Sequence, residues 1–206
     1  VERTGSFNPF LEALSRTTGE LSGAFVYLNL CTQALRERFF AASREDRRLF
    51  AEHVSAEIDG CVGGLVREGA RVLVNTFPIP VERLFGNFSG KEPGSFATQV
   101  RRLNSRVLEM AAQQNSVWVV DVENLAAYHG TQTWLSERYW FHAKCACKPS
   151  FVRELADEIV AVLSAISGKM IKVVVTDLDN TLWGGVIGDD GPDGIRLGGV
   201  GEGEAF

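Results

Sequence analysis

Residues 172–185 read Lys-Val-Val-Val-Thr-Asp-Leu-Asp-Asn-Thr-Leu-Trp-Gly-Gly. The β-branched run before Asp177 predicts a strand that is buried on both faces. Because side chains alternate along an extended chain, Asp177 and Asp179 can address one site just past the carboxyl end of this strand. Open α/β sheets bind ligands at that edge, so the stretch predicts an α/β fold with a functional site at a strand end.

Two carboxylates this close together repel each other unless a cation lies between them. Mg²⁺ binds one or two carboxylates together with the phosphate oxygens of a substrate. With Mg²⁺ bound, Asp177 can attack phosphorus as a nucleophile, and Asp179 can act as the general acid and base. Thr181 is placed to hold the turn or to bind a phosphate oxygen. The alternative is a solvated acidic turn with no catalytic role.

The rest of the chain alternates between predicted strands and helices. Apolar runs predict strands over 24–30, 71–74 and 117–120. Apolar stripes at helical spacing, with Ser43 and Ser95 as caps, predict helices over 43–69, 95–110 and 149–168, and a shorter helix near Phe10. Residues 75–94 are predicted to be a loop, and 31–42 and 131–148 connections. This alternation predicts a parallel sheet with helices on both faces, which is a three-layer fold.

Residues 173–181 resemble the first motif of the haloacid dehalogenase (HAD) superfamily of phosphohydrolases. The surrounding sequence, over 177–191, 194–198 and 203–206, is similar to that of the FkbH-like family. Upstream, residues 75–80, 86–87, 121–130 and 139–144 resemble the SGNH-hydrolase-like N-terminal domain of that family. The resemblance implies an SGNH/flavodoxin-like domain over 1–168. It also implies, over 169–206, the first strand and the β-hairpin flap (184–188) of a HAD-like Rossmannoid domain.

The same resemblance implies the chemistry of the site. Asp177 would be the nucleophile, Asp179 the acid/base, Asn180 and Thr181 phosphate-binding residues, and Mg²⁺ the cofactor. The implied enzyme removes phosphate from 1,3-bisphosphoglycerate and transfers the glyceryl group to an acyl carrier protein, for polyketide (methoxymalonyl-type) biosynthesis. The alternatives are a generic Mg²⁺-dependent HAD phosphatase and a non-catalytic SGNH-like scaffold or carrier-docking module.

A second candidate site follows from the SGNH-like resemblance. Asn75 lies at a strand end where an oxyanion donor could lie, and His142 lies in the late region where a base could lie. The position three before His142 is Tyr139, and no early Gly-Asp-Ser block is present, so working esterase chemistry is disfavoured. Cys145 and Cys147 lie near His142 in the sequence, which suggests a zinc site. Structural zinc needs four ligands, however, so the favoured interpretation is that these cysteines pack as small apolar side chains.

Charge and hydropathy limit the kinds of partner that we expect for this protein. The 21 basic and 26 acidic residues give a formal net charge of −5, without a basic cluster, so a nucleic-acid partner is not expected. No apolar run approaches the about 18 residues of a membrane span, and we expect a cytoplasmic protein without a membrane partner. The chain starts at Val1 and ends at Phe206 just after the HAD-like motif, so we expect a fragment that is inactive alone. The expected partners are a carrier protein and a phosphorylated three-carbon small molecule.

Overall fold

The computed structural model describes residues 21–81, 84–169 and 171–198. The chain divides into two compact units, Val1–Ile166 and Ser167–Phe206, and each is described by itself. The short helix predicted near Phe10 lies outside the described residues. The assignment of 1–168 to an SGNH-like domain and of 169–206 to a HAD-like domain stays a prediction.

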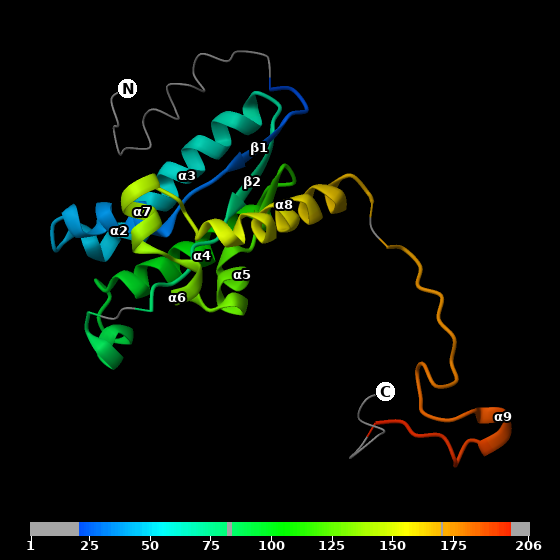
Figure 1. Cartoon of the computed structure of the whole chain (residues 1–206). Helices are drawn as coiled ribbons and strands as arrows, with labels where there is room; N and C mark the ends of the chain where they lie inside the picture. Colours follow the sequence, from blue (N-terminus) through cyan, green and yellow to red (C-terminus); the bar gives the residue numbers. More distant parts are fainter. Residues whose placement is uncertain (1–20, 82–83, 170, 199–206) are drawn as a thin grey trace. The chain divides into compact units, whose positions relative to one another are not determined.

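The first unit contains a sheet of three parallel strands in the order β1-β2-β3 (Figure 1). The strands are β1 (Phe25–Leu28), β2 (Arg71–Asn75) and β3 (Val117–Val120). Val72 lies opposite Val26 on one side and opposite Val117 on the other. All three predicted strands are therefore confirmed, and their carboxyl ends meet at one edge of the sheet.

Seven helices of the first unit connect and follow these strands in the described residues. They are α2 (Thr32–Ala41), α3 (Phe50–Arg67), α4 (Phe96–Gln113), α5 (Val122–His129), α6 (Thr131–Trp134), α7 (Glu137–Ala143) and α8 (Val152–Ile166). Short 3₁₀ turns lie at η1 (Asp46–Leu49), η2 (Gly86–Gly90) and η3 (Pro149–Phe151).

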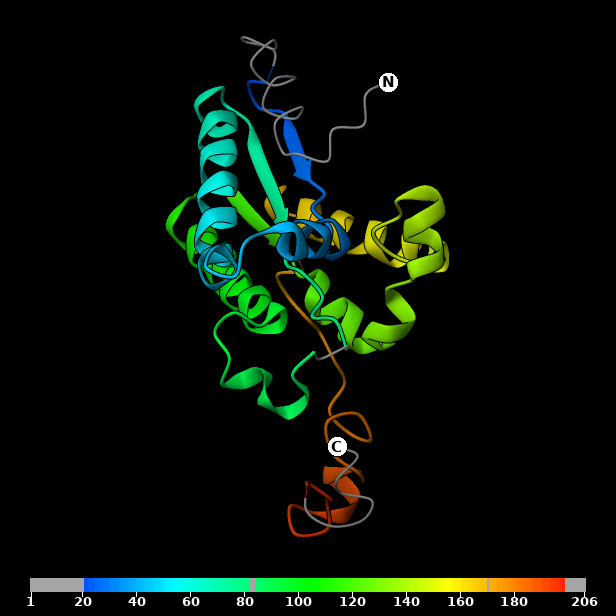
Figure 2. The same ribbon diagram turned by 90° about the vertical axis from the view of Figure 1, so that its left-hand side faces the viewer.

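The sheet has a packed core on each face, because successive side chains point to opposite sides. Leu28, Val72 and Val74 are buried in one cluster with apolar residues of α3 and α4, and α3 runs alongside the strands (Figures 1 and 2). Leu73 and Val120 are buried in a second cluster, which includes Leu155, Ile159 and Val162 of α8. Full burial of one such side chain is worth about 1.5–3 kcal/mol as an upper estimate. The α/β three-layer fold is thus confirmed.

The predicted helix caps are met in part. The Ser95 hydroxyl accepts a hydrogen bond from the Thr98 N–H at 3.3 Å and caps α4 as predicted. Ser43 also accepts from the Asp46 N–H at 3.1 Å, but this turn continues as η1, and α3 begins only at Phe50.

Three helices occupy segments that the sequence predicts as connections. These are α2, α6 and α7, which have four to ten residues each. Trp134 of α6 is 1% exposed and Trp140 of α7 is 6% exposed. Burial of single large side chains stabilises these two short helices, so a long apolar stripe is not needed.

The second unit departs from the predicted strand and hairpin. Residues 171–176 form no strand, and the side chains of Val173, Val174 and Val175 are 76%, 77% and 92% exposed. A parallel strand exists only through ladder bonds to neighbours, and within the described ranges no segment pairs with these residues. The prediction of the first HAD strand is therefore wrong for this structure.

The flap prediction is also corrected. Gly184 pairs antiparallel with Arg196, through N–H to C=O bonds of 3.0 and 2.7 Å, and not with its near neighbours in sequence. Residues Ile187–Asp190 form a helical turn, α9. The carboxylate of Asp190 accepts from the Val186 N–H at 2.8 Å, which favours this turn over a hairpin between 184 and 188.

Candidate functional site

Two regions hold the residues that the sequence marks as functional. We call residues 177–181 of the second unit the acidic turn. We call the residues that follow the three strands of the first unit, namely 29–32, 75–78 and 121–123, the sheet edge.

The two carboxylates of the acidic turn differ in their surroundings. One oxygen of Asp179 accepts from the Trp183 indole N–H at 3.0 Å and from the Ile187 backbone N–H at 3.1 Å, and this residue is half-buried. One oxygen of Asp177 accepts from the Leu178 N–H at 2.8 Å, and this residue is exposed. Asp179 is thus oriented by its partners, whereas Asp177 is open to an incoming group.

The next two residues of the turn also differ. Asn180 has a φ of 53°, which asparagine tolerates better than most residues. Its side-chain oxygen accepts from the Gly185 N–H at 2.9 Å, so this amide closes the loop. Thr181 is exposed, and its hydroxyl donates to the Asp179 C=O at a long 3.4 Å. Of the two predicted phosphate-binding residues, Thr181 has the more available side chain.

The acidic turn offers oxygen donors of the kind that Mg²⁺ prefers. Within the ranges that the structure describes, no group of three His, Cys, Asp or Glu side chains is arranged to hold a metal ion. Mg²⁺ takes one or two carboxylates and completes its shell with substrate phosphate and water, so the chemistry of these two side chains matches this ion. Asp177 and Asp179 are the residues that would hold this ion.

Asn75 at the sheet edge is a structural residue. It is 2% exposed, and its side-chain oxygen accepts from the Leu30 N–H at 2.9 Å. Its NH₂ group donates to the Leu30 C=O at 2.9 Å and to the Thr76 C=O at 2.8 Å. Both amide protons are used within the fold, so neither is available to stabilise an oxyanion. Asn75 ties the exit of β1 to the end of β2.

A network of polar side chains continues along this edge. The Thr76 hydroxyl donates to an Asp121 carboxylate oxygen at 2.8 Å and accepts from the Glu123 N–H at 2.9 Å. Asn104 donates to a Glu123 carboxylate oxygen at 2.6 Å, and it also pairs with the backbone N–H and C=O of Phe77. Burial raises the pKa of Glu123, and the Asp121 charge adds to this, while the bond from Asn104 opposes it.

Asn104 is a residue that the sequence reasoning missed. It lies on α4 and is 4% exposed. Val100 and Val107 lie four positions before it and three after it, which are the spacings of one helix face. An asparagine within a core-facing stripe is therefore the signal that could have found it.

Asn75 and Cys147 line one small pocket, and His142 is not among the described residues that line it. His142 is exposed in the last turn of α7, and no hydrogen bond in the described part of the chain joins it to Asn75. Cys147 is 5% exposed, and burial raises the pKa of its thiol. Cys145 and Cys147 are free thiols. In the described ranges Asn75 and His142 thus share neither a hydrogen bond nor this pocket, and the SGNH pair stays a prediction.

No helix in the described ranges combines the length and the apolar character that crossing a membrane requires.

Comparison with known proteins gives a family match and a structural match. The family model for the FkbH N-terminal domain matches residues 12–164. The chain is similar to the crystal structure of the N-terminal part of protein BF1531 from Bacteroides fragilis, which contains a phosphatase domain and is complexed with Mg. The two are 25% identical with a TM-score of 0.75, and the match covers 88% of this chain and 48% of that chain. The chain therefore spans about half the length of that structure. No curated protein matches.

Proposed function

Since the chain belongs to the FkbH N-terminal domain family, we propose that it is part of a HAD-type phosphatase whose nucleophile is Asp177. The observation that carries this proposal is the unequal pair of carboxylates in the acidic turn, with Asp177 exposed and Asp179 held by two N–H donors. The phosphatase domain and the Mg of the similar Bacteroides fragilis structure support it.

The residues of the acidic turn would divide the reaction between them. The Asp177 carboxylate attacks the phosphorus of a phosphate ester, forming an aspartyl-phosphate while the bond to the leaving oxygen breaks. Asp179 donates a proton to that leaving oxygen. In the second step Asp179 takes a proton from water, the water oxygen attacks phosphorus, and Asp177 is regenerated as phosphate leaves.

The hydrogen bonds to Asp179 support its role. Because one oxygen is held by Trp183 and Ile187, the second oxygen is left for proton transfer in a fixed orientation. Mg²⁺, when bound to the pair, would supply positive charge that offsets the repulsion between carboxylates and phosphate. The exposed hydroxyl of Thr181 would bind a phosphate oxygen.

The finer proposal concerns the substrate and the partner. We propose 1,3-bisphosphoglycerate as the substrate and an acyl carrier protein as the acceptor of the glyceryl group. The thiol of the carrier would attack the C1 carbonyl and displace the C1 phosphate, and Asp177 would remove the phosphate of the C3 ester. The glyceryl thioester would then enter polyketide (methoxymalonyl-type) biosynthesis. The test is an assay, in a longer protein that contains this chain and the remaining HAD motifs, with bisphosphoglycerate, Mg²⁺ and carrier protein. Acylation of the carrier supports the transfer, and phosphate release without acylation supports a generic phosphatase instead.

A non-catalytic role for the first unit is favoured by the sheet edge. Both amide protons of Asn75 are used in the fold, and His142 lies exposed on α7. We propose that this unit serves as a scaffold and not as an esterase. Hydrolysis of p-nitrophenyl acetate by the chain, lost in His142→Ala, would contradict this assignment.

A further inference from the structure

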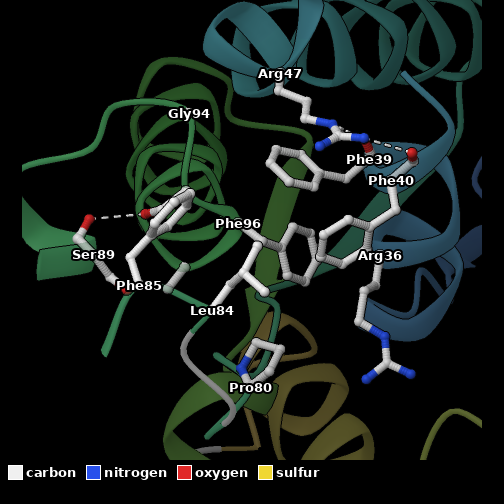
Figure 3. A pocket seen from close by; sticks show the side chains of 12 residues that line it. Arg36, Phe39, Phe40, Arg47, Pro80, Leu84, Phe85, Ser89, Gly94 and Phe96 are labelled. Carbon is white, nitrogen blue, oxygen red and sulfur yellow. Dashed lines mark hydrogen bonds between the residues drawn. The ribbon is translucent and has the colours of Figure 1, made fainter. Parts of the chain in front are cut away.

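A cavity of about 350 Å³ opens between the C-terminal part of α2 and the segment from Leu84 to Ala97 (Figure 3). We call it the aromatic cavity. Its wall is a set of packed rings, in which Phe39 lies 5.3 Å from Phe40 in an edge-to-face arrangement and 5.1 Å from Phe96, centroid to centroid. Phe39 is 2% exposed, so this wall is anchored in the core. The cavity is therefore apolar and rigid on one side.

Large apolar side chains surround the mouth of the cavity. Leu84 and Phe85, which line it, are 76% and 46% exposed, and Phe88 of η2 is 69% exposed. Figure 3 shows Leu84 beside the Phe96 ring. We call Leu84, Phe85 and Phe88 the apolar rim. Contiguous exposed apolar side chains next to a cavity mark an interaction site, because partners insert one large side chain into such a hollow.

Basic side chains line the cavity, although the whole chain has a net charge of −5. Arg36 and Arg47 are the charged residues that line the cavity within the described ranges. The Arg47 guanidinium lies 5.4 Å from the Phe39 ring centroid and 5.5 Å from that of Phe40, held by a bond to the Phe40 C=O at 2.6 Å. Arg47 thus places a fixed cation over the aromatic wall.

Two more basic side chains lie near the cavity. The Lys91 ammonium lies 5.8 Å from the Phe88 ring centroid, on the apolar rim. Arg48 is exposed, and its Cγ lies close to Gly94, a lining residue. The Glu92 carboxylate lies there too and accepts from the Gly94 N–H at 3.0 Å. Glu137 pairs with Arg36 at 2.6 Å, and the Glu92 carboxylate offsets one further cation, so Arg47, Arg48 and Lys91 leave a positive surplus among these groups.

We propose that the aromatic cavity and the apolar rim are a docking surface for an acidic amphipathic helix of a partner protein. One large apolar side chain of that helix would fill the cavity, and its flanking carboxylates would face Arg47, Arg48 and Lys91. A second copy of this chain fits less well, because it would bring the same cations face to face. This inference does not depend on the proposed phosphatase chemistry.

The test uses two fluorescein-labelled helical peptides with the same stripe of leucine and phenylalanine, one flanked by glutamate and the other by lysine. Fluorescence anisotropy measures their binding to the 206-residue chain. We expect the acidic peptide to bind at least about tenfold more tightly than the basic one. Leu84→Asp and Arg48→Glu should each weaken binding of the acidic peptide about tenfold. The first removes an apolar contact with the peptide, and the second replaces a favourable charge with a repulsive one.

Leu108→Asp is the matched control, since Leu108 is 50% exposed on α4 and lies outside the cavity. It should leave binding unchanged, and circular dichroism confirms that each variant is folded. Equal binding of both peptides, binding of neither, or binding that Leu84→Asp does not weaken would overturn the proposal. Self-association in sedimentation experiments that Leu84→Asp removes would assign the surface to a second copy, and would also overturn it.

Discussion

The sheet edge and the acidic turn both place polar side chains after an apolar run, but the fold uses them differently. At the sheet edge, Asn75 and Thr76 give their polar atoms to neighbouring segments and are 2% and 1% exposed. In the acidic turn, Asp177 is exposed beside an Asp179 that is held by two donors. A polar residue at the end of an apolar run is therefore weak evidence for chemistry until its hydrogen-bond partners are known.

The largest effect should come from Asn75→Ala. It leaves the partly buried N–H and C=O of Leu30 without their side-chain partner, and each unsatisfied buried group costs about 1–3 kcal/mol, so we expect a loss of about 2–4 kcal/mol. Urea denaturation followed by far-UV circular dichroism measures this. Asp177→Asn, the counterpart in the acidic turn, should change the free energy of unfolding by less than about 0.5 kcal/mol. Similar losses of unfolding free energy in the two variants would contradict the difference between the sheet edge and the acidic turn.

A matched pair of threonines sharpens the same contrast. Thr76→Val removes a hydroxyl that donates to Asp121 and accepts from Glu123, and we expect a loss of about 1–2 kcal/mol. Thr181→Val changes an exposed hydroxyl with one long bond and should be close to neutral. Thermal melts of both variants measure this difference, and an equal shift of the melting temperature in the two variants would contradict it.

Within the acidic turn, Asp179→Ala and Asp179→Asn separate structure from charge. Alanine removes the acceptor for the Trp183 indole N–H, and we expect a local loss of about 1 kcal/mol. Asparagine keeps an acceptor oxygen and should keep the contact. Hydrogen exchange of the Trp183 indole proton, followed by NMR, should accelerate in the alanine variant only. Unchanged exchange in the alanine variant would show that this bond does not order the turn.

The smallest effect is a pH dependence at the sheet edge. The pKa of Glu123 is raised in the folded chain from 4.5, chiefly by burial, so the folded state binds its proton more tightly than the unfolded state. Its contribution to stability is therefore full below pH 4.5 and is lost as the pH rises through the folded pKa. Glu123→Gln keeps an acceptor for Asn104 and should flatten this slope in denaturation from about pH 4 to about pH 8. A slope that persists in the glutamine variant would exclude Glu123 as its source.

The sequence alone predicted the structure correctly where a local pattern of residues decides it. The three strands and the Ser95 cap of α4 follow from apolar runs and from the chemistry of one hydroxyl. The roles of Asn75 and Asn104 could not be predicted, because both depend on backbone groups 27 or 45 residues away. Residues 171–176 have the composition of a strand, but a strand also needs a neighbour to pair with, and their own sequence does not supply one.

The central claim is that phosphate chemistry belongs to the acidic turn and not to the sheet edge or α7. The most direct test measures Mg²⁺-dependent phosphate release by a longer protein that contains this chain and the remaining HAD motifs, as wild type, Asp177→Asn and His142→Ala. We predict that Asp177→Asn abolishes phosphate release, whereas His142→Ala, an exposed change on α7, leaves it at the wild-type rate. Phosphate release that survives in Asp177→Asn, or that is lost in His142→Ala, would contradict the account.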